Sequence, residues 1–158
     1  MDNATLQLTT PSDVEIIMTR TFNAPRKLVF EAWTNPKHLV VWMLGCEGTT
    51  MPVCEIDLRV GGAWHFVWRH SNGSEMSMSG VYKEVVPPQR LVSTEVWAGL
   101  GPETLNTLVL TEENGRTTIT NTKLFPSQEA RDGALKMGMQ EGVSASFDRL
   151  AAHLASIA

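Results

Sequence analysis

The chain is poor in cysteine. Its 158 residues include only Cys46 and Cys54, which lack the C-x-x-C spacing of zinc and redox motifs. His65 and His70 could add imidazole ligands, but they lie five residues apart on one predicted strand and so point to opposite faces. We therefore predict no metal site and no cofactor, and we expect both cysteines to be free thiols.

An excess of positive charge is also absent. Lys and Arg number 13 against 17 Asp and Glu, so the net charge is −4 and the sequence pI is about 5.5. Phosphate contacts need basic clusters, and none is present. No apolar run approaches the roughly 20 residues that span a membrane, and the polar start MDNATLQLTTPSD has no signal-peptide pattern. These absences predict a cytoplasmic protein with no nucleic-acid partner and no membrane insertion.

Motifs of common enzymes are missing too, including the G-x-S-x-G motif of serine hydrolases. Gly61-Gly62 could suggest a phosphate loop, but the segment after it, AWHFVWRH, alternates like a strand and contains no Walker lysine. We predict a tight turn or bulge there, with a glycine at positive φ. Asp57 and Arg59 lie on the preceding predicted strand and are interpreted as structural charges that can pair with each other.

What the sequence does contain is a regular series of element signals within one domain. We expect a flexible lead over residues 1–12 and a single domain over residues 13–158. Residues 14–22 predict a strand, and Pro25 and Asn35-Pro36 mark the starts of two short helices, the second extending to about Met43. Six further strands with short turns between them imply an antiparallel meander, over residues 53–59, 63–70, 75–86, 90–98, 104–112 and 115–124.

A long C-terminal helix is predicted over roughly residues 127–156. Ser127 can cap its first turn. Gly138 and Gly142 lie inside this helix, so a bend or break can occur there. Its apolar residues recur at helical spacing, at Met139, Val143, Phe147, Leu150 and Leu154.

Large adaptable apolar side chains are abundant. Five Trp and eight Met are more than a small core requires, and walls of Met and aromatic residues are typical of small-molecule cavities. Trp64, Phe66 and Trp68 alternate along one strand and must share a face, which we expect to be the interior. His65 would then face solvent. The predicted ligand-binding residues are Trp42, Trp64, Phe66, Trp68, Met78, Tyr82, Trp97, Met139 and Val143.

Four segments occur in a characteristic order: FNAPRKLVFEAWTNPKHLVVW, EIDLRVGGAWHF, GVYKEVVPPQRLVSTEVW and EGVSASFDRLAAHL. In this order they resemble the START-like (SRPBCC) superfamily, and more narrowly the bacterial homologues of the activator of the heat-shock-protein-90 ATPase. The resemblance implies an α+β helix-grip fold, in which a curved antiparallel sheet wraps around the long helix and often leaves a hydrophobic cavity. The chain departs from this pattern at Trp42-Met43, where members often have two tryptophans, and at Gly142-Val143, where they often have Gly-Trp.

The resemblance is compatible with three functions, because fold does not determine function in this superfamily. The first, which we expect, is binding of a small hydrophobic or aromatic molecule by a monomer or homodimer, with His65, Arg69 or Tyr82 as polar anchors. The second is an interaction module that assists a chaperone or another protein. The third is a polyketide cyclase- or hydrolase-like enzyme, for which His65, Asp57 and Glu95 are candidates by residue type.

Overall fold

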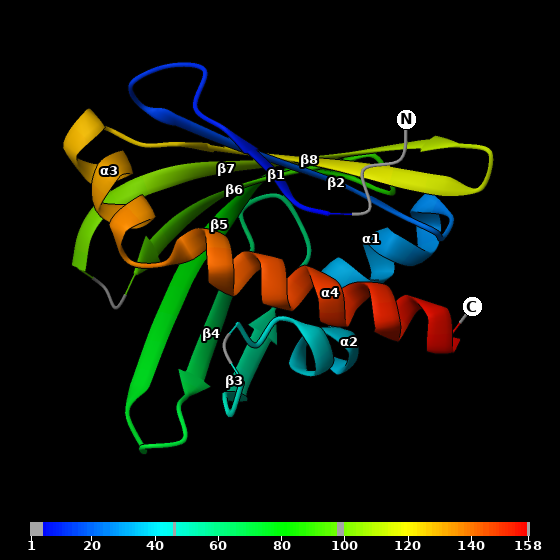
Figure 1. The fold of residues 1–158 in the computed structure, drawn as a ribbon, viewed down its shortest axis with the longest axis horizontal. Coiled ribbons are helices and arrows are strands. Elements are labelled where there is room, and N and C mark those ends of the chain that lie inside the picture. Colours follow the sequence, from blue (N-terminus) through cyan, green and yellow to red (C-terminus); the bar gives the residue numbers. More distant parts are fainter. Residues whose placement is uncertain (1–4, 46, 98–99, 158) are drawn as a thin grey trace.

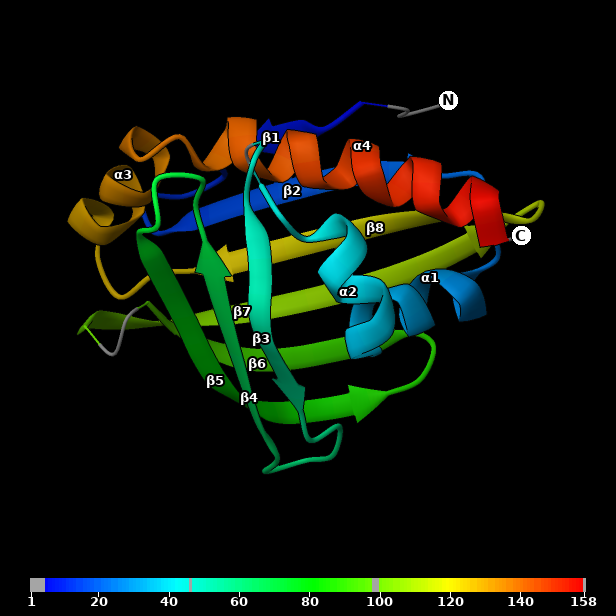
Figure 2. The same cartoon turned by 90° about the horizontal axis from the view of Figure 1, so that it is seen from below.

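The protein is described by a computed structural model over residues 5–45, 47–97 and 100–157. Its strands form one eight-stranded antiparallel sheet in the order β1-β2-β8-β7-β6-β5-β4-β3. The sheet is curved, and the long helix α4 crosses its concave side with α1 and α2 beside it (Figure 1 and Figure 2). This arrangement confirms the predicted helix-grip fold. The elements are β1 (Gln7–Thr9), β2 (Glu15–Phe22), α1 (Arg26–Thr34), α2 (Pro36–Trp42), β3 (Thr50–Ile56), β4 (Ala63–Arg69), β5 (Glu75–Val86), β6 (Arg90–Trp97), β7 (Leu100–Glu113), β8 (Arg116–Leu124), α3 (Gln128–Lys136) and α4 (Met139–Ile157).

The N-terminal segment contains an edge strand that the sequence pattern did not predict. β1 pairs with β2 through Gln7–Thr9. Leu6 and Leu8 pack against a buried cluster on β2, and this contact stabilises a pairing that three residues alone would not signal. The structure therefore differs at β1 from the flexible lead expected over residues 1–12, and residues 1–4 lie outside the described chain.

The two short helices lie where the sequence predicted them. Asn35 separates them, and its side chain caps α2 by accepting a hydrogen bond from the Lys37 backbone N–H at 3.0 Å. Pro36 occupies the first helical position, where a backbone N–H is not needed. Trp42 at the end of α2 is fully buried, and its Nε1 donates to the Ala32 carbonyl at 2.9 Å. This bond ties α2 to α1.

The predicted helix over residues 127–156 is in fact two helices. α3 ends at Lys136, α4 begins at Met139, and Gly138 between them has a φ of +80°. Glycine reaches this left-handed conformation without a Cβ clash, so the chain breaks at the first of the two glycines noted in the sequence. Ser127 caps α3 as predicted. Figure 1 shows α3 turned away from the axis of α4.

The main core lies between α4 and the concave face of the sheet. Phe147, Leu150 and Leu154 are buried and cluster with inward-facing residues of β2, β7 and β8. The Phe147 ring meets the Phe22 ring edge-on, with centroids 5.9 Å apart. Since each fully buried side chain of this size contributes about 1.5–3 kcal/mol, the stripe holds α4 in place over the sheet.

Gly61-Gly62 forms a turn that docks on β5, as the strand-like residues after it predicted. Gly61 has a φ of +83°. Its N–H donates to the Tyr82 carbonyl at 2.8 Å, and the Tyr82 N–H donates to the Gly62 carbonyl at 2.9 Å. β3 ends at Ile56, so Asp57 and Arg59 lie in this loop and not on the predicted strand 53–59. They form an exposed ion pair at 2.9 Å, in keeping with the structural interpretation.

We expect Gly62→Ala to destabilise the fold more than Gly61→Ala. A Cβ at Gly62 would overlap the Asp57 carbonyl oxygen, whereas a Cβ at Gly61 meets no atom within 4 Å and is opposed only by its positive φ, at about 1–2 kcal/mol. Gly133→Ala on α3, where a Cβ also meets nothing, is the matched control and should not destabilise. Urea unfolding measures the order of the three variants, and a Gly62→Ala protein as stable as the control would contradict this turn geometry.

Candidate functional site

Four aromatic rings form a row on the inner side of the sheet. Trp64, Phe66 and Trp68 of β4 are only 5%, 7% and 8% exposed, so the prediction that this triplet faces the interior is confirmed. Ring centroids are 4.8 Å apart for Trp64 and Phe66 and 5.8 Å apart for Phe66 and Trp68. Trp97 of β6 stacks on Trp68 at 5.8 Å and an interplanar angle of 24°. Trp97 is 47% exposed, so the row ends at an accessible ring.

Neighbouring backbone positions the indole rings. Trp64 pairs with Gly80 of β5, and a Cβ at Gly80 would lie 2.7 Å from Trp64 Cζ2, so glycine makes room for the ring. The Trp68 Nε1 donates to the Met43 carbonyl at 2.7 Å, which ties the end of α2 to the row. By contrast, the Trp64 Nε1 is buried without a hydrogen-bond partner among the described residues. A buried N–H of this kind is a donor available to a bound molecule or water.

Alternation along β4 sends two of the predicted polar anchors to the outer face. The His65 side chain is 46% exposed and lies 3.6 Å from Glu55, while Arg69 pairs with Glu75 at 2.7 Å. These two residues are therefore not on the inner face, and their predicted role as inner anchors is wrong. The same outward direction removes His65 from contact with a molecule bound inside.

Tyr82 is the one predicted anchor that faces inward. It lies on β5, is 6% exposed and pairs with Ser93 of β6. Burial, and secondarily the charge of a Cys54 thiolate, raises the pKa of the Tyr82 hydroxyl. Tyr82 therefore stays neutral at physiological pH, as an uncharged hydroxyl on the inner face.

A buried charged pair lies on the inner face beside the aromatic row. Lys123 Nζ of β8 donates to Glu95 Oε1 of β6 at 2.6 Å, and the side chains are only 14% and 8% exposed. Lys123 also donates to Asn106 Oδ1 of β7 at 3.2 Å, and Asn121 Nδ2 donates to the same oxygen at 2.9 Å. Sequence reasoning named Glu95 but missed its partner Lys123 and the two asparagines that extend the network. The only sequence signal for this network was that residues 117–123 place polar side chains on both faces of their strand.

The other predicted ligand-binding residues fall into separate environments. Met78 is buried on β5 beside Phe66. Trp42 is fully buried within 4.8 Å of Trp33, in the part of the core that holds α1 and α2. Met139 packs against a second, smaller cluster of Ile16, Met18 and Phe125 and not in the main core, while Val143 contacts both clusters. The structure thus places Trp42 in the same main core as the buried β4 and β5 residues and leaves Met139 outside it.

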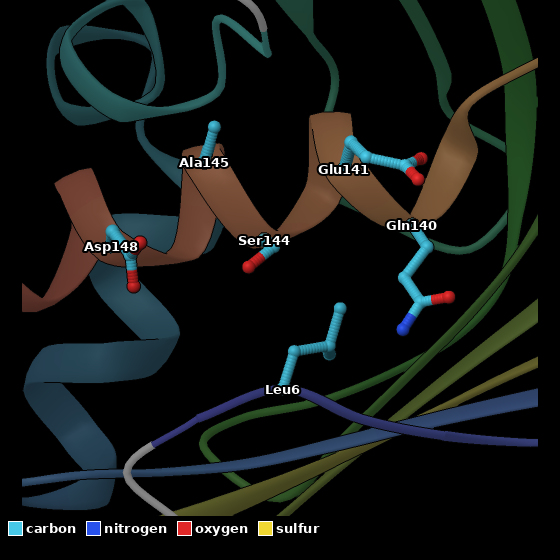
Figure 3. Close-up of a pocket in the computed structure, with 6 residues that line it drawn as sticks. All are labelled: Leu6, Gln140, Glu141, Ser144, Ala145 and Asp148. Atoms are coloured by element: carbon cyan, nitrogen blue, oxygen red, sulfur yellow. The ribbon is translucent and has the colours of Figure 1, made fainter.

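Two open surface pockets occur in the described part of the chain, and the predicted ligand-binding residues do not line either. One lies between the N-terminal segment and α4 (Figure 3), where Asp148 also pairs with the buried Arg20 at 2.8 Å. The other lies on α3. The residues that line the first are Leu6, Gln140, Glu141, Ser144, Ala145 and Asp148.

Two structural features are absent from the described residues, which are residues 5–45, 47–97 and 100–157. Within those ranges no group of three or more His, Cys, Asp or Glu side chains could hold a metal ion, and no described helix is long and apolar enough to cross a membrane. Cys54 on β3 is a free thiol, and burial raises its pKa from 9.0 to about 11. Cys46, the other predicted free thiol, lies outside the described residues.

The fold and this inner surface define the class of protein: a helix-grip α+β domain. The sequence profile described as Activator of Hsp90 ATPase homolog 1-like protein matches residues 23–155, so the chain belongs to that family. This confirms the resemblance noted in the sequence.

Solved structures share this fold. A protein from Rhodobacter sphaeroides superimposes with a TM-score of 0.91 at 27% identity, covering 96% of this chain and 99% of that one. A protein from Mycobacterium smegmatis gives 0.85 at 24% identity, covering 96% and 98%. One from Nitrosomonas europaea gives 0.84 at 23% identity, covering 93% and 97%. The last two show the fold alone, and a comparison with curated proteins finds no match.

Breaking the buried pair should be costly. Lys123→Met leaves the Glu95 carboxylate buried without its partner, which we expect to lower the free energy of unfolding by about 3 kcal/mol. Arg69→Met, which breaks the exposed pair with Glu75, is the matched control and should cost less than about 1 kcal/mol. Equal losses in urea unfolding would show that the inner pair is solvated like the outer one.

The Cys54 thiol should be nearly inert in the folded protein. With a pKa of about 11 against 9.0 for a free thiol, the thiolate fraction near neutral pH falls about a hundredfold. In a Cys46→Ser variant, Ellman's reagent should therefore label Cys54 about a hundredfold more slowly in buffer than in denaturing urea. Stability from the buried thiol should be present below pH 9.0 and be lost as the pH rises toward about 11. Comparable labelling rates in both conditions would contradict the burial of Cys54.

Proposed function

We propose that the protein binds a small hydrophobic or aromatic molecule on the inner face of the sheet, without chemistry of its own. The observation that carries this proposal is the Glu95–Lys123 pair, which is buried beside an aromatic row. An apolar core needs no such pair, because removing two charges from water costs several kcal/mol that their attraction offsets only in good geometry. Polar groups placed among aromatic walls are the usual composition of a ligand site.

The aromatic row suggests the shape of the molecule. Trp97 stacks on Trp68 and remains half-exposed, so a planar molecule can reach this side chain from solvent. The unpartnered Trp64 Nε1 and the neutral Tyr82 hydroxyl can serve a ligand oxygen. A planar apolar molecule with a hydrogen-bond acceptor at one edge is the class that this surface would take.

A protein-binding role has a separate observation in its favour. Several apolar side chains outside the core are exposed, including Val60 at 63% and Val41 at 46%. The family description refers to activation of a chaperone ATPase, and an exposed apolar surface on this chain could serve a chaperone or another protein. An enzymatic role has less support, since His65 and Asp57 are exposed and Glu95 is engaged by Lys123.

Ligand binding can be tested with native mass spectrometry and a fluorescent probe. We expect a co-purified small molecule on the gently isolated protein. In the emptied protein, anilinonaphthalene sulfonate should bind, and Trp97→Ala should weaken its binding about 2- to 10-fold, as loss of a stacking ring implies. Val60→Ala, which shortens an exposed apolar residue on the β3–β4 loop, is the control and should bind as the parent does.

Two results would contradict the proposal: absence of any bound molecule, and probe binding that Trp97→Ala leaves unchanged. Capture of the purified host chaperone by the same protein, lost in a Val41→Asp and Val60→Asp variant, would instead favour the interaction role. The two outcomes separate the functions because Trp97 and Val60 lie on different elements.

A further inference from the structure

A histidine pair joins two helices that are far apart in the sequence. His38 lies on α2 and His153 on α4, and α2 packs on α4 with the two elements side by side in Figure 2. His38 Nδ1 and His153 Nε2 are 2.8 Å apart, and the ring centroids are 5.1 Å apart. Both side chains are half-buried. Within the described residues, neither ring has another hydrogen bond, so this contact is their shared polar interaction.

A bond between two imidazoles constrains their protons. One facing nitrogen must carry a hydrogen and the other must not. The bond therefore exists only while just one of the two facing nitrogens carries a hydrogen. When both carry hydrogens, two donors and two positive rings face each other with no acceptor between them, and the contact becomes repulsive.

No described carboxylate forms an ion pair with either ring of this histidine pair. His65 differs in this respect, because the Glu55 carboxylate lies 3.6 Å from its ring and can balance a positive charge on it. His38 and His153 have no carboxylate of a described residue within 4.0 Å. The charged residues on the elements that pack around the pair are Arg26, Lys27 and Glu31 of α1, Lys37 of α2, Glu55 of β3, and Glu141, Asp148 and Arg149 of α4. Lys37 adjoins His38, and Arg149 lies one turn before His153, so the nearest charges along each helix are positive.

We propose that the His38–His153 pair is a proton-sensitive latch that holds α2 on α4 and releases it when both facing nitrogens are protonated. Release of α2 from α4 would also affect the inner face of the sheet, because the Met43 carbonyl at the end of α2 accepts a hydrogen bond from Trp68 Nε1. Loosening α2 would therefore free one end of the aromatic row. The latch does not depend on any ligand.

The direction of the pH dependence follows from the environment of His153. Burial, and then the charge on His38, lowers the pKa of His153 below its ordinary value of 6.5. The unfolded chain then binds the proton more readily than the folded one, so stability from the pair is present above pH 6.5 and falls as the pH drops below it.

The test compares urea unfolding between about pH 7.5 and about pH 5, the range in which histidine titrates. His153→Gln keeps a side chain that can bond to His38 but cannot titrate. His65→Gln removes an exposed histidine that lies outside the latch and is the matched control. We expect the unfolding equilibrium constant to rise several-fold more on acidification in wild type and His65→Gln than in His153→Gln. Hydrogen-exchange protection of α2, corrected for intrinsic rates, should fall in the same two proteins.

If His153→Gln does not fold, His38→Gln replaces the other titrating ring of the same pair with an amide that can still bond to His153. Identical pH dependence in wild type and the latch variant would overturn the proposal. So would α2 protection in wild type that does not change with pH. A loss of protection confined to α2 and its contacts with α4 would support it, and none of these readouts requires a ligand.

Discussion

The packing of α4 across the concave face of the sheet is the contact on which the other features depend. Phe147, Leu150 and Leu154 bury one stripe of this helix against β2, β7 and β8. Once the helix is there, every second residue of the facing strands is removed from water, and the inner face becomes the place where aromatic and polar side chains meet. The break at Gly138 lets α3 leave the axis, and α2 is held against the other end of α4 through the histidine pair.

Two kinds of side chain share the inner face, and they contribute in opposite ways. The aromatic residues of β4 are stabilised by burial. In addition, the Trp68 indole of β4 donates to the Met43 carbonyl after α2, and the Trp42 indole of α2 donates to the Ala32 carbonyl of α1. The Glu95–Lys123 pair must offset its loss of hydration with a short bond and the help of Asn106. A domain that needed only stability could fill the same volume with apolar groups. This contrast separates what holds the fold together from what the inner face could recognise.

Much of the local structure could be predicted because its signals lie within a few residues. Alternation predicted the strands and the shared face of Trp64, Phe66 and Trp68. Asn35 and Ser127 marked helix starts by capping chemistry. Errors arose where distant contacts decide. β1 depends on leucines that pack against β2. The sequence placed a possible break at Gly138 or Gly142 in the C-terminal helix, and the structure shows that it falls at Gly138. His65 and Arg69 were proposed as anchors before the facing of β4 was known, and that facing excludes them.

The sequence by itself determined the element order after β1, the antiparallel meander, the stripe on the last helix and the turn at Gly61-Gly62, because spacing, capping and backbone freedom are local properties. The tertiary structure alone decided which residues meet. Glu95 and Lys123 come from strands that are not adjacent, and His38 and His153 come from helices separated by most of the chain. No periodicity encodes such encounters, because they follow from sheet register and from where one helix lands on another. The Glu95–Lys123 pair and the histidine latch are therefore properties of the folded chain. The shared face of the β4 aromatic residues, by contrast, could be predicted from their alternation along one strand.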